Sequence, residues 1–243
     1  MPNHTYNEYQ IRKDEPVNAR YYYRTNGLVN LDKSNMPSYQ PEAYQKPGCP
    51  IIVDLNGDGL ITVEDVDMKN VIPSLYWGFG NTFTYKNWDL DVFIYSQLGV
   101  DKYNDVYSWT SGRGLGNQTN NMSVYIKDVW HSELNPNGTI PGIAYEMASV
   151  SLPGGAGTDI GYENSSFVRV RNITLGYNFK PNQLGALSKL LSGIRVYVDV
   201  QNPFTFTGYT GLDPEVNTGG NYKGGKAEYP QTRTFSLGAK LSF

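Results

Sequence analysis

The sequence lacks the features that mark several common classes of protein. A single cysteine, Cys49, among 243 residues excludes an internal disulfide framework. The absence of any run of about 18 apolar residues excludes a transmembrane helix. Charged residues make up only 18% of the chain and the formal net charge is −3, so no broad basic surface indicates a nucleic-acid partner.

Residue sets that carry catalysis or hold zinc are missing as well. The two histidines, His4 and His131, stand far apart in the sequence, and Cys49 has no neighbour at a metal-ligand spacing. The glycine-rich stretch 112–116 neither follows a strand pattern nor opens a helix, although a phosphate-binding loop does both. We therefore expect that the chain is not an enzyme.

The first residues, 1–10, contain neither an apolar core nor a small-residue cleavage site. We therefore predict that this chain carries no secretory signal peptide. Taken alone, this would place the protein in the cytoplasm. That placement conflicts with the strand patterns described next unless the chain is part of a longer protein.

Tyrosine (20 residues) and glycine (26 residues) are abundant, and both suit β-structure with polar loops. The clearest strand is the last segment, 232–243, in which every second residue is apolar. Its apolar positions are Phe235, Leu237, Ala239, Leu241 and Phe243. Because side chains alternate between the two faces of a strand, this segment fits either a half-buried strand of a soluble protein or a barrel strand whose apolar face meets lipid.

The same alternation recurs elsewhere. Residues 75–98 predict a hairpin with a tight turn at 86–87, and residues 194–201 predict another strand. Residues 166–179 also predict a strand, but their apolar positions change phase, so we expect a bulge near 171–172. Residues 19–31 predict an aromatic strand.

The connections between these strands alternate in length. Residues 99–163 and 207–231 are long and irregular, whereas 86–87 and 180–193 are short. Irregular segments of about 60 residues are unusual inside a compact soluble domain but normal on the outer side of an outer-membrane barrel. Short helical turns are expected only within 123–132 and 187–191. This asymmetry favours a barrel.

Residues 54–65 match an EF-hand calcium loop in the order of their oxygen donors. Gly59 stands where the loop needs its sharp turn, and position 12 is aspartate instead of the usual glutamate. The candidate ligands are Asp54, Asn56, Asp58, the carbonyl of Leu60, Thr62 and Asp65. The alternative is a turn rich in Asn, Asp and Gly that binds no ion. No helix clearly precedes the loop, which argues against a paired regulatory EF-hand.

Five segments together resemble the C-terminal part of SusC/RagA-type TonB-dependent outer-membrane transporters of Bacteroidetes. Their order and spacing agree with that family over most of the chain. They are residues 54–62, 76–90, 167–179, 195–215 and 229–243.

The resemblance implies an all-β fold: the C-terminal antiparallel strands of a large transmembrane β-barrel, 22-stranded in the family, with long extracellular loops. It implies import of glycans or peptides across the outer membrane, with a SusD-like surface lipoprotein as lid and the TonB complex as energy source. The calcium-type loop 54–65 would lie within an extracellular loop. The terminal Phe243 resembles the signal that outer-membrane proteins present for barrel assembly.

The resemblance also implies that residues 1–243 are a portion of the barrel without its plug, its N-terminal strands or its TonB-contacting segment. Six or so strands cannot close such a barrel, so we expect the parent protein to lie in the cell outer membrane, in contact with its lipid, and this chain alone to be inactive. The alternative is a secreted calcium-binding β domain that binds carbohydrate or a protein partner. The two differ in whether a second sheet covers Trp77, Phe79, Leu90, Val196 and Leu237.

Overall fold

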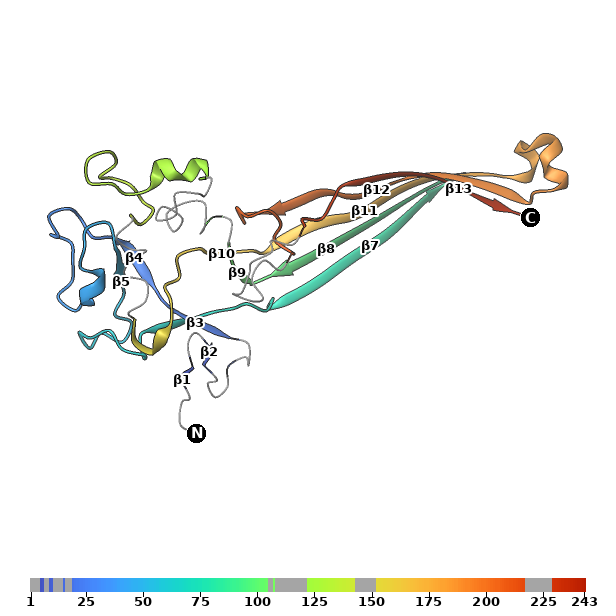
Figure 1. Cartoon of the computed structure of the whole chain (residues 1–243). Coiled ribbons are helices and arrows are strands. Elements are labelled where there is room, and N and C mark those ends of the chain that lie inside the picture. The colour runs from blue at the N-terminus through green and yellow to red at the C-terminus, as the bar shows by residue number, and fades with distance from the viewer. Residues whose placement is uncertain are drawn as a thin grey trace.

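The computed structural model describes residues 5–6, 9–10, 15, 19–104, 107, 122–142, 152–216 and 229–243. Figure 1 shows a long sheet at one end of the molecule and a body of short strands and loops at the other. The sheet is antiparallel, with strand order β13-β12-β11-β8-β7. The strands are β7 (Leu75–Tyr85), β8 (Trp88–Leu98), β11 (Phe167–Phe179), β12 (Gly193–Thr207) and β13 (Thr234–Ser242). These elements confirm the predicted all-β class.

One face of the sheet is apolar across all five strands. Strand pairing aligns the side chains of neighbouring strands in rows that run across the sheet. The central row on this face consists of Phe83, Leu90, Leu175, Val198 and Leu237. Leu237 is 77% exposed and Phe83 is 57% exposed. An apolar surface of this extent is costly in water, so it needs a cover that the described residues do not supply.

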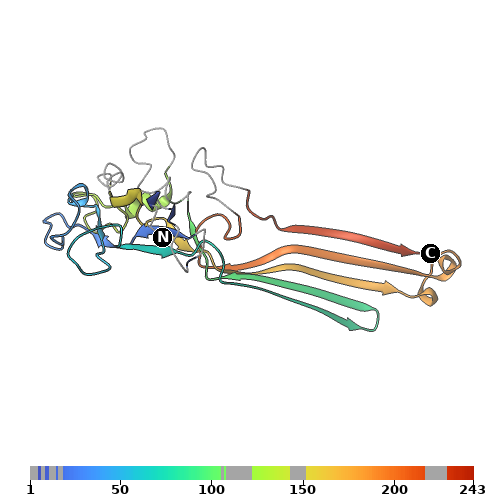
Figure 2. The ribbon, with the colours of Figure 1, turned by 90° about the horizontal axis from the view of Figure 1, so that it is seen from below.

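No second sheet covers this face within the described residues. Figures 1 and 2 show a single layer. None of the five residues that separate the two interpretations is buried; they are Trp77, Phe79, Leu90, Val196 and Leu237. The apolar face therefore has the geometry of a barrel wall and not that of one half of a sandwich. In the same described part, no helix is long and apolar enough to cross a bilayer.

Aromatic side chains gather at both ends of the apolar face. At the end with the short turns, the Trp88 ring lies 4.8 Å from Tyr177, which in turn lies 4.7 Å from Phe179. At the opposite end Phe204 and Phe206 are exposed. Aromatic girdles on either side of an aliphatic band are typical of strands that cross a membrane.

The predicted bulge is confirmed. The register of β11 shifts between Val170 and Asn172 against both of its neighbours. The extra residue restores the phase, because Val170 then pairs with Ile94 and Ile173 pairs with Val92 on one apolar face. Without the bulge, half of β11 would turn its apolar side chains towards the polar face.

The short connections lie together at the far end of the sheet, near the C-terminus (Figure 1). The predicted two-residue turn at 86–87 is confirmed, with Lys86 at φ 57°. The second short connection contains two 3₁₀ helices, η4 (Pro181–Gln183) and η5 (Gly185–Lys189). A helical turn was predicted here at 187–191, so its position differs by about two residues, as element ends commonly do.

Outside the long sheet, the described residues form four two-stranded sheets. They are β1 (Thr5–Tyr6) with β2 (Tyr9–Gln10), β3 (Arg20–Tyr23) with β6 (Val66–Lys69), β4 (Thr25–Leu28) with β5 (Pro50–Ile52), and β9 (Asp101–Tyr103) with β10 (Tyr162–Asn164). The other described elements of this part are the 3₁₀ helices η1 (Glu42–Tyr44), η2 (Val124–Asp128) and η3 (Pro153–Gly155).

One prediction for the body was inaccurate: the single aromatic strand expected within 19–31 is two strands with different partners. The short helical turn expected within 123–132 is confirmed as the 3₁₀ helix η2. The glycine-rich stretch 112–116 and His4 lie outside the described residues.

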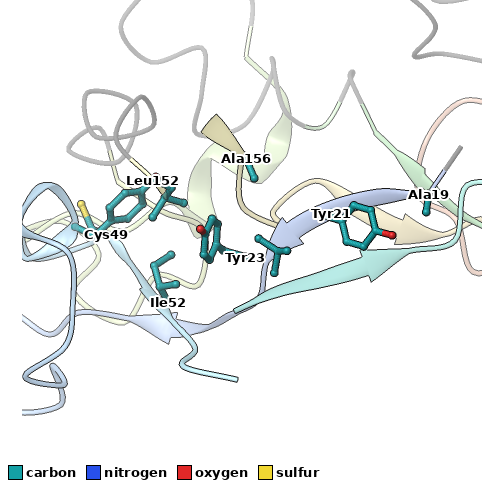
Figure 3. Close-up of a cluster of buried hydrophobic side chains, with 9 residues drawn as sticks. Ala19, Tyr21, Tyr23, Cys49, Ile52, Leu152 and Ala156 are labelled. Atoms are coloured by element: carbon teal, nitrogen blue, oxygen red, sulfur yellow. The ribbon is translucent and has the colours of Figure 1, made fainter. Parts of the chain in front are cut away.

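The core of the body is a small cluster in which three of the nine buried residues are tyrosines (Figure 3). Tyr23 is fully buried, and its hydroxyl donates to the carbonyls of Thr62 and Pro153, at 2.9 Å each. Burial and the nearby charge of Asp65 raise the pKa of Tyr23 to about 12. Tyr23 therefore ties the end of the 54–65 loop to the core.

Candidate functional site

The face of the sheet opposite the apolar face carries a polar network from three strands. The carboxylate of Asp89 on β8 accepts hydrogen bonds from the guanidinium of Arg195 on β12 and, at 2.5 Å, from Asn178 Nδ2 on β11. Asp91 accepts from Thr82, and Asp199 accepts from Thr174 at 2.6 Å. This face suits a wall that borders water or a polar plug.

Asp89 differs from the other two carboxylates of this face. Strand pairing places Asp89, Asp91 and Asp199 on the same face of the sheet. Asp91 is partly exposed, with 42% of its side chain accessible, but Asp89 is buried against Arg195. Asp89 therefore joins β8 to β12 across the intervening strand.

A glycine makes this cross-strand ion pair possible. Gly176 lies on β11 between the partners, and a Cβ there would lie 2.6 Å from Asp89 Oδ2 and 2.7 Å from Arg195 Nε. Such contacts are far inside van der Waals distance, so the salt bridge occupies the volume that any other residue would fill.

We expect Gly176→Ala to destabilise the sheet by about 1–3 kcal/mol, because the new methyl group displaces the Asp89–Arg195 pair. Gly80→Ala is the matched control, since a Cβ on that glycine meets only Phe93, at 3.6 Å. The measurement is urea unfolding of the whole protein, folded in detergent. Equal midpoints for the two variants would contradict the role assigned to Gly176.

A second cluster anchors the loop after β12 to the end of the sheet. Arg169 is only 2% exposed. Its Nε donates to Thr205 Oγ1 at 2.9 Å, its Nη1 to Glu215 Oε2 at 2.7 Å and its Nη2 to Asp213 Oδ1 at 2.9 Å. A buried guanidinium with three acceptors is satisfied only while the loop stays in place.

Further contacts hold the same loop. The Lys102 ammonium of β9 donates to the carbonyls of Pro214 and Val216, and Arg171 pairs with Glu215. Burial alone would raise the pKa of Asp213, but hydrogen bonds from the Glu215 N–H, from Arg169 and from the Gln231 N–H outweigh it and lower that pKa. The loop 208–216 is therefore held at the end of the sheet by Arg169, Arg171 and Lys102.

The predicted calcium loop folds into a series of side-chain-supported turns. Asp54 accepts from the N–H groups of Gly57 and Gly59, at 2.7 and 2.8 Å. Asn56 accepts from the Asp58 N–H at 2.9 Å, and Asp58 accepts from the Leu60 N–H at 2.8 Å. These bonds place the first three candidate ligands along one curled segment.

Asp65 serves the loop differently. Its Oδ1 accepts from the N–H groups of Leu55 and Asn56, and its Oδ2 accepts from the N–H and the hydroxyl of Thr62. Burial opposes ionisation, but these hydrogen bonds lower the pKa of Asp65. A carboxylate has about four acceptor sites, and all are engaged here. In this conformation Asp65 therefore joins the start of the loop, at Leu55 and Asn56, to Thr62 near its end.

The described residues contain no group of three or more His, Cys, Asp or Glu side chains placed to hold a metal ion. The donors that fit calcium best are therefore a mixed set: two carboxylates, an amide, a carbonyl and a hydroxyl, from Asp54, Asn56, Asp58, Leu60 and Thr62. Calcium binding by this loop stays a prediction.

Comparison with known proteins gives a consistent set of relatives. No family model matches the sequence. The chain is 28% identical over 242 residues to TonB-dependent receptor P3 of Formosa agariphila, a match that covers 96% of this chain and 23% of that protein. It is 33% identical over 208 residues to TonB-dependent receptor SusC of Bacteroides thetaiotaomicron, covering 83% of this chain and 19% of that protein.

A solved structure has the same fold. The structure of the RagAB peptide transporter matches with a TM-score of 0.66 at 23% identity, covering 93% of this chain and 22% of the matched one. The chain thus spans about a fifth to a quarter of the length of the relatives it matches.

Proposed function

Because the chain belongs to the SusC/RagA family of TonB-dependent receptors, we propose that it forms part of the barrel wall of an outer-membrane nutrient importer. The substrate class is a glycan or a peptide. A SusD-like surface lipoprotein is the proposed partner, and the TonB complex is the proposed energy source, acting on a part of the receptor other than this chain. We further propose that the chain alone transports nothing.

The observation that carries this proposal is the two-faced single sheet. One face is apolar across five strands, and the other carries the Asp89–Arg195 network. Among the described strands, β7 and β13 each have a neighbour on one side only. Unpaired backbone groups inside a bilayer cost several kcal/mol each, so a stable wall needs further strands on both edges.

The lengths of the connections between strands indicate which end of the sheet faces the outside of the cell. The turn 86–87 and the connection 180–192 lie at one end, and the body with the 54–65 loop lies at the other. Outer-membrane barrels have short turns on the periplasmic side and long loops outside. We therefore propose that the body lies outside the cell.

Uptake measurements test the proposal. We expect cells that express the full-length receptor to accumulate a labelled oligosaccharide or peptide, and we expect both TonB depletion and deletion of residues 1–243 to abolish accumulation. The control is a receptor of unaltered sequence expressed at the same level. Undiminished uptake after deletion of the segment would refute its role in the wall.

We also propose that the loop 54–65 binds calcium on the outer side. We expect Asp58→Ala to remove one equivalent of bound calcium from the full-length receptor in calorimetric titration, because affinity depends on the number of charged ligands. Asp32→Ala is the matched control: Asp32 also accepts a backbone N–H two residues ahead, from Ser34 at 3.0 Å, but it lies outside the loop. Equal stoichiometry in the two variants, or no binding at millimolar calcium, would exclude the site.

A further inference from the structure

A pocket of about 460 Å³ lies in the body. Its wall is built from the pair β4–β5, from 139–141, from 159–163 and from Thr210. Small-molecule sites usually have volumes of about 300–1,000 Å³, so this one has room for a small ligand or for part of a longer one. Neither the apolar face nor the polar network of the sheet contributes to it.

Two carboxylates stand in fixed positions in the wall of this pocket. Glu163 Oε1 accepts from Asn104 Nδ2 and from the Thr210 hydroxyl, at 2.8 Å each, and its Oε2 accepts from the Thr210 N–H at 2.8 Å. Asp159 Oδ1 accepts from the hydroxyl of Thr25 at 2.7 Å. No Lys, Arg or His is among the described residues that line the pocket.

Tyrosine rings form much of the remaining wall. Tyr107 and Tyr125 contact each other edge to face, with ring centroids 5.5 Å apart. The Tyr162 ring lies 4.3 Å from Tyr22 and 5.2 Å from Tyr103, so its orientation is fixed by its neighbours. Rigid aromatic rings beside a few polar groups are typical of pockets that orient a ligand with both apolar and polar surfaces.

We propose that this pocket binds neutral sugar units of an oligosaccharide and excludes anionic ones. A pyranose ring offers an apolar face to tyrosine, and its hydroxyls both donate and accept, which matches the mixture of carboxylate, amide and threonine groups. This inference rests on the proposed import function, because it names the class of substrate that the outer loops select.

Charge distinguishes a neutral sugar from the two alternative ligands, an anionic sugar and a basic peptide. A uronate or a sulfated sugar would bring a third negative charge next to Asp159 and Glu163. Among the described residues that line the pocket none is a cation, and the nearby Lys69 ammonium already pairs with Asp159, 3.9 Å from its Oδ2. A basic peptide would be favoured if the carboxylates lacked donors. Glu163 instead has neutral donors on both oxygens, so its charge is already stabilised.

Calorimetry on the full-length receptor that carries this chain tests the proposal. The probes are maltohexaose, cellohexaose and mannohexaose as neutral sugars, hexagalacturonate as the anionic sugar and hexalysine as the cationic peptide. We expect at least one neutral hexasaccharide to bind and the other two classes not to bind. Binding of hexagalacturonate or hexalysine in preference to all three neutral sugars, or binding of none of the probes, would overturn the proposal.

Variants locate the binding in this pocket. Tyr125→Ala is expected to weaken binding of the neutral sugar about tenfold, whereas Tyr125→Phe, which keeps the ring, is expected to leave it nearly unchanged. The double change Asp159→Asn and Glu163→Gln keeps acceptors in place but removes the charges, and hexagalacturonate is then expected to bind. Unchanged affinity in Tyr125→Ala, or continued rejection of hexagalacturonate by the double variant, would place the sugar elsewhere.

Cellular uptake of the same hexasaccharide separates this inference from the proposed function. If the receptor binds the sugar in this pocket but cells do not accumulate it through TonB, the import function fails and the pocket stands. If uptake depends on TonB but the sugar binds the Tyr125 and carboxylate variants as it binds the unaltered receptor, the import function stands and the pocket assignment fails.

Discussion

Replacement of Arg169 with methionine is expected to release the loop 208–216 from the end of the sheet. The guanidinium is 2% exposed and is bound by Asp213 and Glu215, both from this loop. Removing one partner of a buried ion pair leaves uncompensated charge and costs about 3–5 kcal/mol. Amide hydrogen exchange of residues 209–216 in the full-length receptor should accelerate by at least about a hundredfold.

Arg171→Met is the control for this prediction. Arg171 pairs with the same Glu215, but 28% of its side chain is exposed and the pair lies nearer to solvent. Ion pairs of that kind contribute about 0–1 kcal/mol, so exchange in the loop should change little. Similar acceleration in the two variants would show that Arg169 has no special role as the anchor.

An arginine on the apolar face is expected to be far more damaging than an arginine one residue away. Leu237→Arg places a charge in the central apolar row, whereas Ser236→Arg places it on the polar face, because Ser236 pairs with Asp199. Arginine at the middle of a bilayer costs a barrel about 2–4 kcal/mol, whereas changes that face the lumen are tolerated. The measurement is the folded fraction of the full-length receptor in lipid vesicles against urea concentration.

This pair of variants also separates the two fold interpretations. In a soluble sandwich, Leu237→Arg would likewise be harmful, but its cost would not depend on lipid. The difference between the two variants should therefore be large in vesicles and should shrink in short-chain detergent, where the charge reaches water. A lipid-independent difference would contradict membrane burial of this face.

Strand periodicity made the sheet largely predictable from the sequence. Side chains alternate with a period of two, so 232–243 and 194–201 revealed their two faces directly. The bulge in β11 was predictable for the same reason, since Val170 and Ile173 stand an odd number of residues apart and yet must share a face. Local pattern and tertiary structure agree wherever one face alone is apolar.

The polar clusters were not predictable, because their partners are far apart in the chain. Asp89 and Arg195 are separated by 106 positions, and Arg169 and Asp213 by 44. In the sequence these residues look like ordinary polar positions of alternating strands. Gly176 gave the only local hint, since a glycine inside a strand often marks the close approach of another group.

The structure of the calcium-type loop was likewise predictable only in part. The spacing of Asp54, Asn56 and Asp58 correctly predicted a tightly turned segment. The position of Asp65 in the motif suggested a ligand, but its shorter side chain accepts four hydrogen bonds from the loop itself. A motif specifies donor types, whereas the competition between backbone and ion for the same oxygen atoms depends on the folded geometry.

Lipid contact along β12 is the most direct test of whether the apolar face of the sheet meets the membrane. Spin labels at 196, 197, 198 and 199 of the full-length receptor in bilayers would report accessibility to oxygen, which partitions into lipid, and to a water-soluble nickel complex. Positions 196 and 198 are expected to favour oxygen and positions 197 and 199 to favour nickel, in alternation. Uniform accessibility along these four positions, or the opposite phase, would contradict a barrel wall whose apolar face meets the membrane.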